Sequence, residues 1–172
     1  MHDMTAAGPW RDGTLFHQQA EPVYHAPLPA HQAFVKQAAQ MAQVRYHPAH
    51  PHPGSSGPEA GRGDNLCRWL ACEQGSQAEG ISQGGLDALL DSYLPAGASV
   101  GWHLHHDTEE YYYLLQGQLW VEWQGEGVAR QGAWMAAGDC HRLGPGMWHW
   151  AQAGTEGARF IAVVLRCREV SA

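Results

Sequence analysis

Most of the chain after Asn65 is a succession of short apolar segments, separated by glycine, proline or aspartate at intervals of roughly 8–12 residues. In order they are NLCRWLAC, LDALLDSYL, SVGWHLH, EYYYLLQ, QLWVEWQ, GVARQGAWM, MWHWAQA and ARFIAVVLR. They are rich in the aromatic and β-branched residues that favour strands. The pattern predicts an all-β domain, an antiparallel sandwich or barrel, over residues 65–172.

The first 64 residues have a different character. Residues 1–30 show no sustained period and are expected to form an irregular arm. Within residues 31–45 the apolar positions fall on one helical face, which predicts one short amphipathic helix. Residues 46–64 form a loop rich in proline, glycine and serine that contains the tract HPAHPHP. Histidine-rich tracts can bind metal weakly. In this one the prolines keep the chain extended and no carboxylate is present to complete a site, so a flexible loop is favoured.

Charge and composition exclude several classes of protein. The net charge of −7 gives no electrostatic support for a nucleic-acid or anionic-membrane partner. No signal peptide and no apolar run of about 18 residues is found, so a cytoplasmic protein is expected. The four cysteines lack zinc-like spacing, and buried reduced thiols are expected at Cys67, Cys72, Cys140 and Cys167.

The stretch GWHLHHDTEEYYYLLQG, residues 101–117, concentrates the groups that can carry chemistry. On a strand, His103 and His105 point to the same face. After a short turn, Glu110 begins a second strand and shares its face with Tyr112. Two imidazoles and a carboxylate inside a barrel are costly without a partner, and a divalent metal is the natural one. His149, in GPGMWHW, is the best candidate for a fourth ligand.

Two motifs resemble those of the cupin superfamily. GASVGWHLHHDTEEYYYLLQG, from Gly97 to Gly117, is similar to the first, in which glycine, HxH, glutamate and glycine recur at this spacing. GDCHRLGPGMWH, from Gly138 to His149, is similar to the second, although the family's proline falls one place earlier than Pro145. The family's asparagine, four residues after the histidine, is alanine here. The resemblance covers about residues 65–168.

This resemblance implies a jelly-roll β-barrel of six to eight strands with one divalent metal per chain, either Fe, Mn, Ni, Cu or Zn. The implied ligands are His103, His105, Glu110 and His149. Glu109 also meets the looser spacing, but Glu110 lies seven residues before the closing glycine, as the family's ligand does.

The side chains around this site carry further expectations. His106 is out of phase with the ligands and His141 falls in a turn, so both are expected at the rim. Tyr112 is either a core tyrosine or an acid/base group. Outward-facing aromatic residues suggest a homodimer, as in many cupins; these are Tyr111, Tyr113, Trp148 and Trp150.

Two functions fit this description. The first is a metal-dependent enzyme, an oxidoreductase such as a dioxygenase, or a decarboxylase or other lyase, acting on a small oxygenated or carboxylate-bearing molecule. The alternative is a non-catalytic cupin that binds or senses a small molecule. A helix-turn-helix is absent from the sequence, which argues against a transcription regulator. A sugar-nucleotide epimerase cupin would not require the full ligand set.

Overall fold

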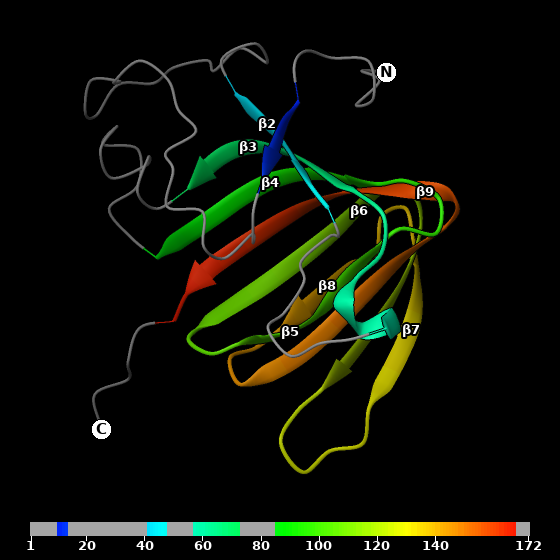
Figure 1. Cartoon of the computed structure of the whole chain (residues 1–172). Coiled ribbons are helices and arrows are strands. Elements are labelled where there is room, and N and C mark those ends of the chain that lie inside the picture. Colours follow the sequence, from blue (N-terminus) through cyan, green and yellow to red (C-terminus); the bar gives the residue numbers. More distant parts are fainter. Residues whose placement is uncertain (1–9, 14–40, 48–56, 73–84, 168–172) are drawn as a thin grey trace.

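The computed structural model describes residues 10–13, 41–47, 57–72 and 85–167. Within these residues all elements are strands except one 3-10 turn, so the prediction of an all-β chain is confirmed (Figure 1). The elements are β1 (Arg11–Gly13), β2 (Ala42–Tyr46), η3 (Gly57–Ala60), β3 (Asn65–Cys72), β4 (Leu86–Leu94), β5 (Ser99–His105), β6 (Thr108–Gln124), β7 (Gln131–Ala136), β8 (Cys140–Leu143) and β9 (Met147–Arg166).

Two long antiparallel strands, β6 and β9, organise the sheet because each takes part in two half-sheets. The large half-sheet runs β1, β2, β3, β4, then residues 158–166 of β9, residues 108–117 of β6, and β8. The small half-sheet runs β5, then residues 147–153 of β9, residues 118–124 of β6, and β7. All pairs are antiparallel except β1 with β2.

Glycines mark the corner where β6 and β9 pass from one half-sheet to the other. Gly117 and Gly157 both have a φ of 81°, a left-handed conformation that favours glycine. A Cβ atom on Gly117 would collide with the carbonyl oxygen of Gly157, so the two backbones can cross closely only without a side chain. The sequence predicts separate strands on either side of Gly117, whereas the structure shows one strand that bends there.

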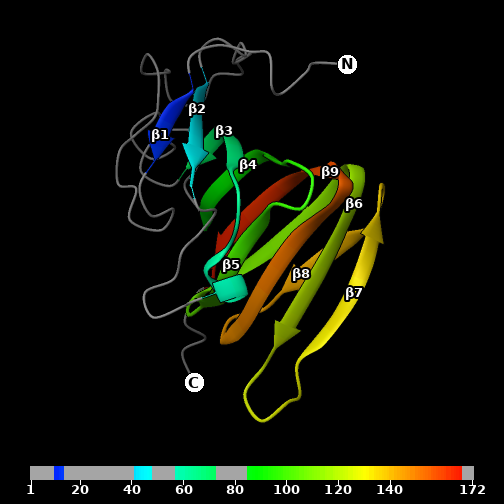
Figure 2. The same cartoon turned by 45° about the vertical axis from the view of Figure 1, so that its right-hand side comes forward.

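One hydrophobic core lies between the two half-sheets. It combines Leu90, Leu114 and Phe160 of the large half-sheet with Val100 and Val121 of the small one, all at most 2% exposed. The half-sheets therefore pack against each other, as Figure 2 shows from a second direction. This arrangement is consistent with a jelly roll, although strand pairing among the described residues does not close into a ring.

The predicted helix over residues 31–45 is not supported. Its described end belongs to β2, where Val44 and Tyr46 are buried while Arg45 between them is exposed. This alternation is the period of a strand, and pairing with β3 fixes it. Residues 31–40 and most of the HPAHPHP tract lie outside the described residues.

The cysteines only partly match the prediction. Cys67 is buried, but Cys140 is exposed because it points outward from β8, so the expectation of a buried thiol is wrong there. Cys167 is half-buried, and these three thiols are free. No helix in the described part of the chain is long and apolar enough to cross a membrane.

Candidate metal centre

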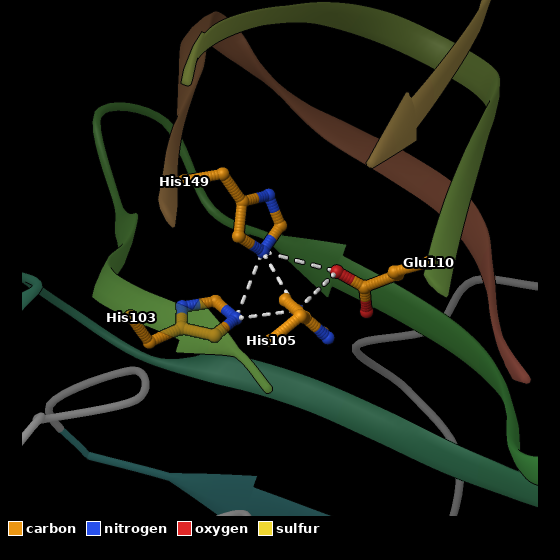
Figure 3. A group of neighbouring side chains, drawn as sticks. All are labelled: His103, His105, Glu110 and His149. Carbon is orange, nitrogen blue, oxygen red and sulfur yellow. Dashed lines mark hydrogen bonds and ion pairs between the residues drawn. The ribbon is translucent and has the colours of Figure 1, made fainter. Parts of the chain in front are cut away.

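Four side chains converge where the half-sheets meet. His103 and His105 come from β5 and His149 from β9, and the pairing of these strands sets His103 directly opposite His149. Glu110 comes from the large half-sheet, where it pairs with Leu143 of β8. Figure 3 shows the three imidazoles and the carboxylate pointing toward a common centre. The small half-sheet thus supplies three nitrogen donors and the large half-sheet one oxygen donor.

The donor atoms lie at separations suited to a shared ion. The Nε2 atom of His149 is 2.8 Å from that of His103 and 3.3 Å from that of His105, while the Nε2 atoms of His103 and His105 are 3.2 Å apart. Glu110 Oε2 lies 3.0 Å from His149 Nε2 and 3.3 Å from His105 Nε2. Metal–ligand bonds of about 2.0–2.2 Å place neighbouring ligands roughly 2.8–3.6 Å apart, which matches these separations.

Hydrogen bonds on the far side of two rings orient them. His103 Nδ1 lies 2.7 Å from the carbonyl oxygen of Gly101. A carbonyl can only accept, so Nδ1 of the neutral ring donates and Nε2 keeps its lone pair. His105 Nδ1 lies 2.9 Å from the hydroxyl of Thr108, at the start of β6. Both rings are therefore held with Nε2 toward the centre.

Burial and mutual attraction shift the titration of the cluster. Burial alone would lower the pKa of His105, but the charge of Glu110 outweighs it and raises that pKa. Burial would raise the pKa of Glu110, yet the charge of His105 and a smaller contribution from His149 hold it well below its usual range. For His149 burial wins, and its pKa is lowered. In the metal-free cluster the carboxylate thus favours a proton on His105, which a bound cation would displace.

The residues fit a divalent metal. Three Nε2 atoms cannot approach to about 3 Å with all lone pairs facing inward unless a proton or cation lies among them. Glu110 Oε2 is buried without a hydrogen bond of good geometry, although two imidazole nitrogens surround it. A shared cation would satisfy all four atoms at once. Three imidazoles and one carboxylate suit Fe, Mn, Ni, Cu or Zn.

Glu109 occupies the opposite face of β6. Its carboxylate accepts a hydrogen bond of 2.7 Å from Arg142 Nη2 and another of 3.3 Å from the hydroxyl of Tyr111. Of the two glutamates that the spacing allowed, Glu110 alone joins the three histidines.

Tyr112 shares the inward face with Glu110, as the period of the strand predicted. It is 3% exposed, and its ring centroid lies 5.4 Å from that of His149 and 4.5 Å from that of Phe160. Burial, followed by the charge of Glu110, raises its pKa well above the ordinary value. The raised pKa keeps the phenol of Tyr112 protonated at neutral pH.

His141 belongs to a strand and not to a turn as predicted, and its side chain is half-buried. It belongs to β8, where it alternates with exposed neighbours and shares the inward face with buried Leu143. Burial and the nearby His149 lower its pKa to about 4. The alternation within CHRL was the available signal, but four residues are too few for a pattern to stand out. His106, in contrast, is exposed as predicted.

The aromatic residues expected to face outward differ among themselves. Tyr113 is 47% exposed, whereas Tyr111, Trp148 and Trp150 are half-buried. The rings of Trp148 and Trp102 are stacked with centroids 6.3 Å apart.

Comparisons with known proteins agree with the observed fold. A family model described as "Cupin domain" matches residues 91–164. A solved structure described as a predicted oxalate decarboxylase from Thermotoga maritima is similar with a TM-score of 0.55 and 21% identity, covering 77% of this chain and 99% of that one. At 21% identity, this similarity concerns the fold alone.

Oxalate decarboxylase from Bacillus subtilis, in a structure at pH 4.6, is similar with a TM-score of 0.52 and 25% identity. The match covers 59% of this chain and 25% of that one, so only about a quarter of the Bacillus enzyme is matched. The description of another structure of the same enzyme mentions Mn(II) centres. That structure is similar with a TM-score of 0.51, 24% identity and the same coverage. No curated protein matches this sequence significantly.

Proposed function

Because residues 91–164 form a cupin domain, we propose that this protein is a metal-dependent enzyme acting on a small molecule that bears a carboxylate or another oxygen group. One observation carries the proposal: three imidazole nitrogens from the small half-sheet and one carboxylate oxygen from the large one lie within 4.8 Å of one another. Lyase chemistry, specifically decarboxylation, is the preferred reaction because the Bacillus structure is described as an oxalate decarboxylase and the Thermotoga structure as a predicted one.

One divalent ion per chain would be held by His103, His105, Glu110 and His149. Such an ion polarises a bound oxygen group as a Lewis acid, and a redox-active ion can also exchange electrons. Manganese is the first candidate because the Bacillus enzyme is described with Mn(II) centres. Iron, nickel, copper and zinc remain compatible with the same donors.

The side chains around the ion would exclude water from the substrate and supply a proton to it. His149 is 0% exposed and Glu110 5% exposed, so a substrate group that enters here exchanges bulk water for fixed protein dipoles. Tyr112 holds a proton on its hydroxyl close to Glu110 and can donate it to a substrate atom on which negative charge develops. The three histidines keep their Nε2 atoms directed at the reacting group.

A non-catalytic binding protein is the second candidate. It needs only the four side chains that would hold the metal and a bound small molecule, with no proton transfer from Tyr112. A homodimer also stays a proposal, supported by the exposure of Tyr113 (47%) and Leu115 (40%) on the outer face of β6.

The test begins with elemental analysis of the purified chain and of His149→Ala. About one ion per wild-type chain and none in the variant is expected. Manganese-loaded protein is then incubated with oxalate, malonate and pyruvate while carbon dioxide release and oxygen uptake are followed together.

The outcomes separate the candidate functions. Carbon dioxide release without net oxygen uptake supports a lyase, and stoichiometric oxygen uptake supports an oxidoreductase. Binding of an anion without product supports the non-catalytic alternative. Failure of the wild-type chain to retain any divalent metal after reconstitution contradicts the metalloenzyme.

A further inference from the structure

His141 is the polar side chain beside the metal centre that the ligand set does not use. On β8 it pairs across the strands with Tyr112, and the two lie on the same face, where Tyr112 is buried and His141 half-buried. Its neighbours Cys140 and Arg142 are exposed on the other face. The strand therefore directs one imidazole to the same side of the sheet as Glu110, which pairs two positions further along with Leu143.

Aromatic rings from both half-sheets surround His141. Its ring centroid lies 5.3 Å from Trp123, 6.4 Å from Tyr112 and 6.1 Å from His149. Trp123 in turn pairs directly with His149 across β6 and β9. His141 thus belongs to the wall next to the centre, too far from it to be a ligand but near enough for a small molecule to reach both.

The Nε2 atom of His141 is buried and has no hydrogen-bond partner among the residues that the structure describes. A buried imidazole nitrogen without a partner costs free energy, so such an atom is normally satisfied. The described residues around it offer aromatic rings and a metal-ligating histidine whose own Nε2 is directed elsewhere. An ordered water or a small molecule that enters the site can supply the missing partner.

We propose that His141 contacts the substrate: its Nε2 hydrogen bonds to a second oxygen-bearing group of a small carboxylate whose first carboxylate occupies the metal centre. The inference rests on the proposed function and narrows its substrate class to small molecules with two oxygen functions, such as dicarboxylates and 2-oxo or 2-hydroxy acids. A monocarboxylate with an apolar tail leaves the nitrogen unpaired and is disfavoured.

The test compares oxalate with acetate on the manganese-loaded full chain by titration calorimetry. His141→Phe keeps a ring of similar size and removes the hydrogen bond. It is expected to weaken oxalate binding about 10- to 100-fold while acetate affinity changes less than about twofold. His141→Gln retains a polar group and should recover part of the loss. Cys140→Ala, one residue away on the exposed face, is the matched control and should bind both anions as wild type does.

Metal content and melting temperature are measured for every variant, so that a folding defect is recognised. If His141→Phe binds oxalate as tightly as wild type, or loses oxalate and acetate equally, the inference is wrong while the metal-dependent function stands. If the loaded wild-type chain binds neither anion, the proposed function fails and the inference fails with it. Selective loss of oxalate affinity with metal content unchanged supports the contact.

Discussion

Two carboxylates in this molecule are equally buried, yet their surroundings differ completely. Glu110 on β6 and Asp91 on β4 are each 5% exposed. Asp91 accepts hydrogen bonds of 2.9 and 2.7 Å from Nε and Nη2 of Arg159, and Arg68 Nη1 lies 3.8 Å away. The carboxylate of Glu110 has no guanidinium partner among the described residues and faces imidazoles instead.

The contrast shows that the partner, and not burial, distinguishes a structural carboxylate from one in a site. A guanidinium is permanently charged and has no lone pair to offer a metal, so the Asp91 pair is complete in itself. An imidazole can lose its proton and then presents a lone pair. The cluster around Glu110 therefore has donor capacity left over, whereas the cluster around Asp91 has none.

The largest expected effect concerns metal affinity. Glu110→Gln preserves shape but removes the negative charge that attracts the ion, and it should lower metal affinity at least about 100-fold. Asp91→Asn makes the same chemical change in the other buried carboxylate and should alter affinity less than about twofold. Competition titration against a chromogenic chelator measures both. Equal losses would mean that the two carboxylates are not functionally distinct.

Stability should show the opposite ranking. Asp91→Asn leaves buried Arg68 and half-buried Arg159 without their counter-charge, and we expect it to lower the free energy of unfolding of the metal-free protein by about 3 kcal/mol. Urea unfolding monitored by tryptophan fluorescence measures this loss. The melting temperature of Asp91→Asn should still rise on metal addition, whereas that of Glu110→Gln should not. A stable Asp91→Asn variant would show that this pair contributes little.

A smaller effect is expected from the residue that orients His105. Thr108→Val keeps the β-branched shape but removes the hydroxyl that lies 2.9 Å from His105 Nδ1. Loss of such an orienting contact should lower metal affinity about 10- to 100-fold. Thr155→Val, at an exposed position in β9, is the matched control. Unchanged affinity in Thr108→Val would show that packing alone orients the ring.

Local patterns in the sequence were sufficient where strand period and motif spacing act within one hairpin. They indicated that Glu110 and Tyr112 share a face, while the second motif indicated His149 as the further ligand. They failed where the answer depends on pairing between distant segments. Gly117 appeared to end a strand because glycine is typical both of turns and of bends within a strand. The segment of β2 appeared helical because its strand conformation depends on pairing with β3, which lies some twenty residues further along the chain.

His141 shows the same limit inside the site. Its strand has only four residues, and pairing with β6 rather than its own sequence makes it face inward. The family motif could not indicate it either, because the histidine falls at a position between the motif's fixed residues. Only the fold brings it beside Tyr112 and Trp123.

The smallest expected effect extends the contrast to the half-buried imidazole of His141. Burial, then the charge of His149, lowers the pKa of His141 from an ordinary 6.5 to about 4. Between pH 6.5 and about 4, His141 takes up a proton in the unfolded chain but not in the folded chain. The contribution of His141 to the free energy of unfolding is therefore fully present above pH 6.5 and is lost as the pH falls toward about 4. His141→Phe and His141→Gln cannot take up this proton, so each should reduce the pH slope of metal-free stability by at most about 1.4 kcal/mol per pH unit. Urea unfolding at several values between about pH 7 and pH 4.5 measures the slope. Because the two variants pack differently but lack the same proton, a change in only one of them would assign the effect to packing.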